Sequence, residues 1–374
     1  MSIHPTLRID LDAVIHNYKL LVHACPNSVV ASVVKDDAYG CGASVIAKTL
    51  YEQANCRSFF VAYASEGLSI RSFVPNADIY VLQGFDTEES NAYMLGNLIP
   101  VIACPEQLKM WNEVKPNDLR AAIQVETGLN RLGFSLPQIM DLSEKERLNF
   151  GLVLSHLACA DESDSPFNLS QLIRFNELRY FFPNARLSLA ASDGCSLGQK
   201  YHFDVVRGGA FLYGINTFPF LKKEQKNVIT VSAPIVLIKS LSQSDYVGYG
   251  ADFHAKDGTK IAVASIGYGD GLFRSFSPKG YVWFQTDNGW ISAPVAGRVS
   301  MDNLIIDVTL IPDSVLKTAK EVFLLCEKQT VDDLGNVCKT IGYEVASAFG
   351  HGTRYHRIYS LKGTFLSAED ILGN

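Results

Sequence analysis

Residues 29–62, VVASVVKDDAYGCGASVIAKTLYEQANCRSFFVA, decide how the first half of this chain folds. The stretch opens with an apolar, β-branched run at Val29–Val34 and continues with an amphipathic run at Ala43–Gln53. It closes with a second apolar run at Ser58–Ala62. A strand, a helix and a second strand of these lengths form a right-handed crossover, which makes the two strands parallel.

The same alternation continues to about residue 220. Six further runs have the length and apolar character of strands: Asp78–Leu82, Ile99–Ala103, Ala121–Val125, Phe150–Ser155, Leu187–Ala190 and Phe203–Val206. Helical stretches are expected between the strands at Glu66–Phe73, Pro105–Val114 and Asn168–Phe182, the last with Leu169, Leu172, Ile173 and Phe175 at helical spacing. Eight such units predict a (β/α)8 TIM barrel. A doubly wound open sheet is the alternative, because strand counting alone does not exclude it.

The pattern changes after about Phe220, where the polar stretch Leu221–Asn227 is typical of a linker. Beyond it, strand-like runs dominate: Ala233–Ser240, Lys260–Ile266, Tyr281–Gln285, Trp290–Val295, Leu304–Val308 and Val322–Cys326. Thr330 and Asp333 form a capping-box pattern that predicts a helix over Val331–Ile341. The second half is therefore expected to be mostly antiparallel β.

Composition excludes several classes of protein. The net charge is −6 and no basic stripe is present, which argues against nucleic acid as the main partner. No apolar run approaches the ~18 residues of a membrane span. Met1–Leu11 lacks the apolar core of a signal peptide. The eight cysteines form no CxxC motif and have no histidine at metal-ligand spacing, so we expect free thiols in a reducing cytoplasm and no metal.

In a barrel, function lies in the loops that follow the carboxyl ends of the strands. Lys35 ends the run Val29–Val34, so its stem lies in apolar surroundings. Desolvation disfavours an ammonium there, and a neutral amine can form an imine. The alternative is a lysine that extends from the barrel mouth into solvent.

The exits of the seventh and eighth strands are rich in groups that bind anions. Ser192 offers a hydroxyl, and Gly208 and Gly209 allow backbone N–H groups to approach a phosphate closely. Ordinary turns would also account for these glycines. A strand-end lysine, a glycine-rich exit and the adjacent Arg207 together suggest pyridoxal phosphate. Arg131 can bind a carboxylate, and His156 can hydrogen-bond a neighbouring charge, although a structural histidine is equally typical of a strand end.

Taken together, these segments resemble the alanine racemase family over nearly the whole chain. The matching motifs are Thr6–Ala13, Val33–Gly42, Glu126–Gly133, Ser155–Leu157, Val206–Arg207, Tyr213–Gly214, Gly267–Gly271, Gly297–Asp302 and Gly342–Val345. Asp36 and Cys41 depart from the family's lysine motif, which usually has Ala and His there. The family's fold is a barrel followed by a β domain. We therefore expect a barrel at residues 9–222 and a β domain at residues 223–374. Residues 1–8 are expected to belong to the β domain as well.

The resemblance implies a role for each matching residue. Lys35 would bind pyridoxal 5'-phosphate as an imine, and Arg207 would face its ring nitrogen. Its phosphate would be held by Tyr39, Ser192, Gly209, Ala210 and Tyr343. Arg131 and Met301 would contact the substrate. Family members often carry a carbamylated lysine where Gln124 stands, so either the Gln124 amide or an anion such as chloride replaces it, or Arg131 is less restrained.

The implied reaction is the interconversion of L-alanine and D-alanine, which supplies D-alanine for peptidoglycan. Lys35 would serve the D-alanine face, and Tyr268 from the partner subunit of a homodimer would serve the L-alanine face. A chain from Tyr268 through His156 to Arg207 would stabilise the phenolate. Arg207 carries only donors, so the ring nitrogen would stay unprotonated and transamination would be suppressed.

Two alternatives to this function follow from the sequence. A non-catalytic pyridoxal-phosphate carrier consists of a lone barrel, whereas this chain has a second domain that contains Tyr268 and Met301. A racemase of broader side-chain specificity is not excluded by any residue named above.

Overall fold

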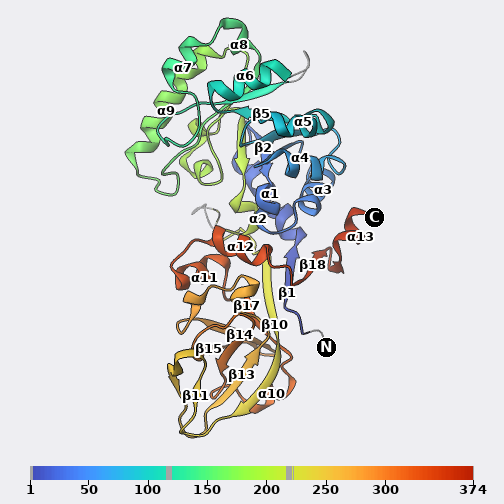
Figure 1. The fold of residues 1–374 in the computed structure, drawn as a ribbon, viewed down its shortest axis with the longest axis vertical. Helices are drawn as coiled ribbons and strands as arrows, with labels where there is room; N and C mark the ends of the chain where they lie inside the picture. Colours follow the sequence, from blue (N-terminus) through green and yellow to red (C-terminus); the bar gives the residue numbers. More distant parts are fainter. Residues whose placement is uncertain (1–2, 115–119, 216–220, 222, 374) are drawn as a thin grey trace.

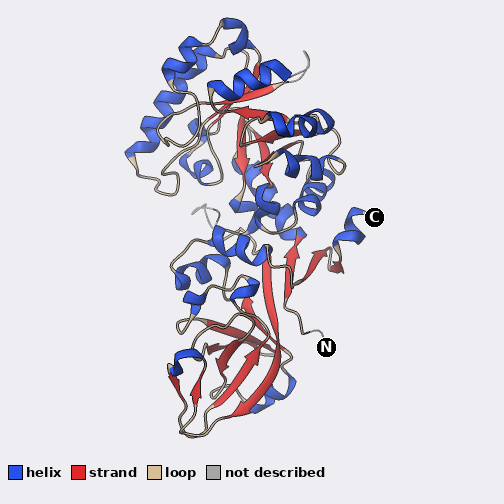
Figure 2. Ribbon diagram, viewed as in Figure 1, coloured by secondary structure: helices blue, strands red, loops and turns tan. Residues whose placement is uncertain are grey.

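The computed structural model describes residues 3–114, 120–215, 221 and 223–373. Figure 1 shows two parts arranged end to end along the longest axis. Figure 2 shows that helices surround the strands of the first part, whereas long strands dominate the second. No helix in the described ranges combines the length and hydropathy needed to cross a membrane.

The first part is a parallel sheet of eight strands in the order β8-β7-β6-β5-β4-β3-β2-β9. The strands are β2 (Val29–Val33), β3 (Ser58–Val61), β4 (Asp78–Val81), β5 (Ile99–Ile102), β6 (Ala121–Gln124), β7 (Phe150–Leu154), β8 (Arg186–Ser188) and β9 (Val205–Gly208). A parallel bridge between Ala191 and Arg207 joins the two ends of this order. The Arg207 N–H also donates to the Ala190 carbonyl at 3.0 Å. The sheet is therefore closed into the expected TIM barrel.

Both faces of the barrel strands are buried, which explains their continuous apolar runs. Alternate residues such as Ala31, Val33 and Phe60 fill the barrel interior. Their neighbours in sequence, such as Val30 and Phe59, pack outward against the helices. These helices are α1 (Leu11–Ala24), α3 (Ala43–Gln53), α4 (Ala64–Arg71), α5 (Ser90–Gly96), α6 (Pro105–Val114), α7 (Leu136–Asp141), α8 (Glu144–Leu148) and α9 (Pro166–Leu178).

The second part is built on a nine-stranded sheet. Its strands are β1 (Thr6–Asp10), β10 (Ile229–Ser240), β13 (Lys260–Ala264), β14 (Tyr281–Thr286), β15 (Gly289–Pro294), β16 (Leu304–Asp307), β17 (Glu321–Leu325), β18 (His356–Leu361) and β19 (Thr364–Leu366). A small hairpin pairs β11 (Tyr246–Val247) with β12 (Phe253–His254). The helices of this part are α10 (Asp313–Thr318), α11 (Val331–Cys338), α12 (Gly342–Gly350) and α13 (Ala368–Leu372).

Strand β1 links the two parts. It pairs antiparallel with β10 and parallel with β18, so it lies inside the second sheet. Asp10 ends the strand and caps α1 by accepting a hydrogen bond from the Ala13 N–H at 2.9 Å. The chain therefore passes directly from the β sheet into the first helix of the barrel.

Two details of the helices differ from the sequence expectations. In α9, Leu172 and Phe175 are buried, but Leu169 and Ile173 are about half exposed. The polar Asn168 and Gln171 occupy the inner face instead because they hydrogen-bond to barrel loops. The helix expected over Val331–Ile341 ends at Cys338, and a second helix, α12, follows. The expected linker Leu221–Asn227 includes Lys222, which lies outside the described residues.

Candidate active site

A cavity of about 940 Å³ lies between the barrel and α11–α12. The carboxyl ends of the barrel strands and the loops that follow them form one wall of the cavity. The cavity brings together nine residues expected from the sequence: Lys35, Tyr39, Arg131, His156, Ser192, Arg207, Gly209, Ala210 and Tyr343. Asp332, Asn336 and Thr340 add polar groups on the side of the second domain.

Lys35 begins a tight left-handed turn, labelled α2 (Lys35–Tyr39) in Figure 1. Four successive residues without glycine, Asp36–Tyr39, have φ between 50° and 56°. Such a run costs conformational energy, so the surrounding contacts must stabilise it. Asp36 accepts hydrogen bonds from Ser347 at 2.5 Å and His351 at 2.8 Å, both from the region of α12. The second domain therefore fixes the turn that carries Lys35.

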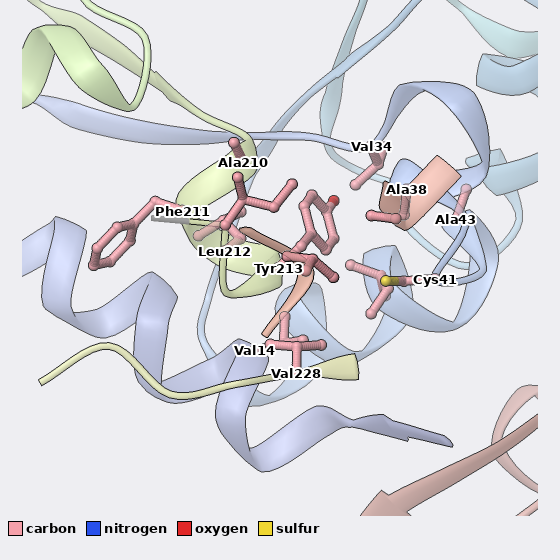
Figure 3. Packing of buried hydrophobic residues seen from close by; sticks show 14 of the residues in the cluster. Val14, Val34, Ala38, Cys41, Ala43, Ala210, Phe211, Leu212, Tyr213 and Val228 are labelled. Carbon is pink, nitrogen blue, oxygen red and sulfur yellow. The ribbon is translucent and has the colours of Figure 1, made fainter. Parts of the chain in front are cut away.

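The turn also packs on a rigid apolar cluster. Figure 3 shows Tyr213 among Val34, Ala38 and Cys41, behind the turn. The Tyr213 hydroxyl donates to the Val33 carbonyl at 2.8 Å. The buried Cys41 takes the place of the family's usual histidine as an apolar side chain in this cluster.

The electrostatic surroundings of Lys35 favour the neutral amine. Burial, and next the charge of Arg131, lower the pKa of Lys35. Asp36 and Glu66 oppose this shift because their negative charges favour the ammonium. The lowered pKa increases the fraction of amine available to act as a nucleophile or base.

The buried Arg207 and the half-buried His156 form a hydrogen-bonded pair that lines the cavity. The Arg207 guanidinium donates to the Ser188 hydroxyl at 2.6 Å, to the Ser155 carbonyl at 2.6 Å and to His156 Nδ1 at 3.2 Å. His156 Nδ1 is therefore an acceptor, which places the ring proton on Nε2. Burial and the charge of Arg207 lower the pKa of His156 to about 3, so the ring is neutral at physiological pH. Burial lowers the pKa of Arg207 to about 10, which leaves it protonated.

A cradle of hydroxyl and backbone groups lies at the exits of β8 and β9. The Ser192 Oγ accepts from the Gly209 N–H at 3.0 Å and from the Phe211 N–H at 3.4 Å. A Cβ at Gly209 would lie 2.7 Å from the Tyr39 hydroxyl oxygen, so the cradle needs glycine there. Burial raises the pKa of both Tyr39 and Tyr343, and both phenols therefore remain donors.

The N–H and O–H donors of this cradle can hydrogen-bond a phosphate, and the Lys35 amine can form an imine with an aldehyde. Arg207 suits a ring nitrogen because it presents N–H groups and positive charge. The residues present therefore fit pyridoxal phosphate, in agreement with the sequence expectation.

Arg131 projects from a closed loop after β6. The Glu126 carboxylate accepts from the Gly128 N–H and from the Asn130 N–H, the latter at 2.8 Å. Gln124 donates to the Leu132 carbonyl at 3.0 Å. Gln124 thus holds the backbone next to Arg131 through its amide nitrogen, whereas the expectation was that its amide oxygen would take the place of the family's modified lysine.

Tyr268 and Met301 lie elsewhere, on an exposed edge of the second domain. Among the residues the structure describes, neither lines the cavity, and their exposed fractions are 44% and 54%. The segments that carry Tyr268 and Met301 are connected by a hydrogen bond from the Tyr268 N–H to the Ser300 carbonyl at 3.0 Å. Arg354 bridges Asp270 at 2.8 Å and Asp302 at 2.6 Å across the same edge. Tyr268 and Met301 therefore lie together, outside the cavity that Lys35 lines.

Two supporting residues escaped the sequence analysis. Gln171 donates to the His156 carbonyl at 3.0 Å and to the Thr127 hydroxyl at 3.1 Å, so it fixes the loop that carries His156. Asp36 was recognised only as a departure from the family motif. An acidic residue beside the strand-end lysine was the available signal, but its partners Ser347 and His351 lie about 310 positions away in sequence.

Comparison with known proteins agrees with this geometry. The family model described as "Alanine racemase, N-terminal domain" matches residues 9–217, and "Alanine racemase, C-terminal domain" matches residues 228–359. An alanine racemase of Rickettsia canadensis is 40% identical over 363 residues, which cover 95% of this chain and 99% of that protein. One from Rickettsia africae is 38% identical over 362 residues, 95% of this chain and 98% of that protein.

Solved structures show the same similarity. The crystal structure of alanine racemase from Bartonella henselae with covalently bound pyridoxal phosphate has a TM-score of 0.86 and 31% identity, covering 96% of this chain and 99% of that one. Biosynthetic alanine racemase from Pseudomonas aeruginosa has a TM-score of 0.87 and 29% identity, covering 96% and 100%. The barrel and its cavity define an enzyme dependent on pyridoxal phosphate. Within that class, the chain belongs to the alanine racemase family.

Proposed function

We propose that this chain racemises alanine with two proton-transfer groups, Lys35 and Tyr268, which two subunits contribute to each site. The observation that carries the proposal is the cavity that gathers Lys35, the Arg207–His156 pair and the Ser192 cradle. In this arrangement Lys35 would bind pyridoxal phosphate covalently. Its phosphate would be held by Tyr39, Ser192, Gly209, Ala210 and Tyr343.

When bound, pyridoxal phosphate withdraws electrons from the amino acid and makes its Cα proton acidic. Arg207 would face the ring nitrogen as a donor, and it has no lone pair to hold a proton there. A carboxylate in this position would keep that nitrogen protonated. Arg207 therefore limits the electron withdrawal, which favours return of the proton to Cα over transamination.

Once the substrate amine has displaced Lys35 from the cofactor, the free Lys35 Nζ would take and return the proton on the D-alanine face. Its lowered pKa suits this task, since a base works best when its pKa is near the working pH. On the L-alanine face, the hydroxyl of Tyr268 of the partner subunit does the same. The neutral His156 can donate its Nε2 proton to a phenolate, and the adjacent Arg207 adds positive charge. Arg131 binds the substrate carboxylate, and Met301 of the partner subunit offers its backbone N–H.

The proposal requires a head-to-tail homodimer. In one subunit Tyr268 lies on the exposed edge described above and not in the cavity of the described chain. A two-fold axis lets each β domain cover the cavity of the other barrel. We also propose domain units at 9–222 and 223–374 with residues 1–8, supported by the pairing of β1 with β10 and β18. The free cysteines favour a reducing compartment, the cytoplasm.

Borohydride reduction followed by peptide mapping tests the assignment of Lys35. The purified holoenzyme should be yellow, and the reduced adduct should map to Lys35. Conversion of L-alanine to D-alanine should be lost in the Lys35→Ala variant, whereas Lys48→Ala on α3 is the matched control. An adduct on another lysine would contradict the assignment. Rates on L-serine and other L-amino acids, measured in the same preparation, define the side-chain specificity.

A further inference from the structure

The fold brings together three side chains outside the active site, of which Cys25 lies far from the other two in the sequence. Cys25 lies at the end of α1, Cys195 lies in the short helix η3 (Asp193–Leu197) that follows β8, and His202 lies seven residues further on. The two sulfur atoms and one imidazole nitrogen lie within 4.8 Å of one another. All three side chains are buried, with at most 5% exposed. Cysteine and histidine spacing in the sequence gives no sign of this cluster because Cys25 comes from a distant segment.

The hydrogen bonds of the cluster distinguish between a metal site and a thiol site. His202 Nε2 lies 3.0 Å from the Cys195 carbonyl oxygen, which can only accept. This nitrogen therefore carries a proton and cannot at the same time bind a metal with its lone pair. The same nitrogen lies 3.8 Å from the Cys25 sulfur, within the distance for hydrogen bonding to sulfur. The observed arrangement thus favours thiol chemistry at Cys25.

The two thiols are not equivalent. The Cys195 thiol donates to the Ala191 carbonyl at 3.4 Å and so retains its proton. The neighbouring Cys195 side chain, and next the hydrogen bond with His202, lower the pKa of the Cys25 thiol below its usual value, against the effect of burial. The bond to Cys25 and burial raise the pKa of Cys195. Of the two sulfurs, Cys25 therefore has the greater tendency to ionise, and Cys195 tends to stay protonated.

We propose that Cys25 and Cys195 form an oxidisable pair in which Cys25 reacts with a hydroperoxide and Cys195 resolves the product as a disulfide. The Cys25 thiolate attacks one peroxide oxygen, the O–O bond breaks, and the leaving hydroxide takes up a proton as water. Cys25 is then a sulfenic acid. The Cys195 sulfur attacks the Cys25 sulfur, the S–O bond breaks, and the hydroxide leaves as water with the Cys195 proton. Two thiols lose two electrons in total, and hydrogen peroxide is reduced to two molecules of water.

The position of the pair permits this chemistry. Pro26 and Asn27 next to Cys25 are exposed, as are Gly198 and Gln199 beyond Cys195. The sulfurs must approach to about 2.05 Å to form a disulfide. Gly198, with φ of 99° and no neighbour within 4 Å of an added Cβ, gives the Cys195 segment room to move.

The test is peroxide treatment of the holoenzyme, followed by alkylation in denaturant and mass mapping of all eight cysteines. The first disulfide to form should join Cys25 to Cys195. Its rate should rise with pH around a midpoint below the ~8.5 of an ordinary thiol. The charged and titratable groups that face the pair are His202, Asp193 and Arg207. The His202→Gln variant should move the midpoint upward and leave the disulfide connectivity unchanged.

Single serine variants separate the two roles. In Cys195→Ser, oxidation should stop at a sulfenic acid on Cys25, which dimedone traps. In Cys25→Ser, Cys195 should remain unoxidised over the same period. Cys159→Ser, in the loop after β7, is the matched control and should leave the disulfide unchanged. Circular dichroism before treatment verifies that each variant is folded.

Three results would overturn the proposal. One is a different first disulfide, and another is equal oxidation of Cys195 in the Cys25→Ser variant. The third is stoichiometric zinc or copper in the purified holoenzyme that is lost on mutation of Cys25, which would make the cluster a metal site.

Discussion

The surroundings of His156 strongly control the protonation of its side chain. Its pKa of about 3 in the folded protein lies far below the ordinary value near ~6.5. At pH values between these two pKa values, the His156 ring binds a proton in the unfolded chain but stays neutral in the folded chain. The stability contributed by the neutral ring is therefore complete above pH ~6.5 and is lost as the pH falls toward 3.

A His156→Gln variant should be less sensitive to acid than the parent. From pH 7 to pH 5, the parent should lose about 2 kcal/mol more free energy of unfolding than the variant, because only its unfolded state gains the His156 proton. Urea unfolding at both pH values and one protein concentration measures this difference. His23→Gln, at an exposed position on α1, should retain the parent's pH dependence. An equal loss in parent and His156→Gln would contradict the neutral ring.

A Tyr268→Phe variant should separate the two faces of the reaction. Lys35 remains, so exchange of the Cα proton of D-alanine with solvent should persist. Proton removal from L-alanine should fall by roughly 10²–10⁴, the usual contribution of a positioned general base. Racemisation should be lost in both directions because each direction needs both groups.

The decisive measurement for Tyr268→Phe is deuterium incorporation at Cα, followed separately from each pure enantiomer. Tyr281→Phe, at another exposed tyrosine of the β domain, is the control and should behave like the parent. Equal loss of exchange from L- and D-alanine would contradict the two-base assignment.

At the scale of single elements, the left-handed turn α2 depends on close contact with α12. An added Cβ at Gly40 would lie 2.5 Å from the Gly350 Cα, so Gly40→Ala must displace α12. We expect overpacking to lower the free energy of unfolding by about 1–3 kcal/mol. The backbone strain of alanine at positive φ adds to this loss. Cofactor retention should also fall, because Tyr39 and Tyr343 lie on these two elements.

Gly258→Ala is the matched control for backbone strain. Gly258 has φ of 80°, close to the 81° of Gly40, but nothing lies within 4 Å of its added Cβ. The melting temperature and the cofactor absorbance after gel filtration should fall further for Gly40→Ala than for Gly258→Ala. Equal effects in the two variants would mean that the contact of α2 with α12 is not needed.

The accuracy of the sequence predictions differs between strands and helices for a physical reason. Each barrel strand is buried on both faces, so its apolar run predicts its position within one or two residues. Helix α9 was less well predicted because Gln171 is buried for its hydrogen bonds and not for its hydrophobicity. The break between α11 and α12 lies at Lys339, which adopts φ of 60°, a conformation that a lysine does not signal in a sequence.

At the scale of the whole molecule, the shared site predicts complementation between inactive subunits. Lys35→Ala and Tyr268→Phe subunits, mixed and allowed to exchange, should form heterodimers with one intact site each. Random exchange should restore roughly a quarter of the parent's activity, since half of the dimers are heterodimers and half of their sites are intact. Two different affinity tags allow the heterodimers to be isolated and assayed.

The control for complementation is a mixture of Lys35→Ala with Arg131→Ala. Both changes affect the same barrel cavity, so each site in the heterodimer retains one defect and no activity should return. Isolated Lys35→Ala/Tyr268→Phe heterodimers without activity would contradict the shared site.

For the proposed shared site, the strand pattern predicted the barrel residues, whereas the family resemblance predicted Tyr268 and its origin in the partner subunit. Lys35 and Arg207 follow strands of one barrel, so barrel geometry alone brings them together. Tyr268 and Met301 became candidates only through the family resemblance, because an exposed edge leaves no apolar periodicity to detect. The Cys25–Cys195–His202 cluster also escaped prediction, since it depends on the contact of α1 with the loop after β8.

The position of β1 between β10 and β18 has a consequence for synthesis on the ribosome. Thr6 pairs with Ser232 on one side and with His356 on the other. At a translation rate of 5–20 residues per second, roughly 20–70 s separate Thr6 from its second partner. The barrel strands emerge within this interval and can close first. The nascent chain therefore carries an incompletely paired strand ahead of its barrel, and the β sheet is completed only after Leu366, the last residue of β19, has left the ribosome.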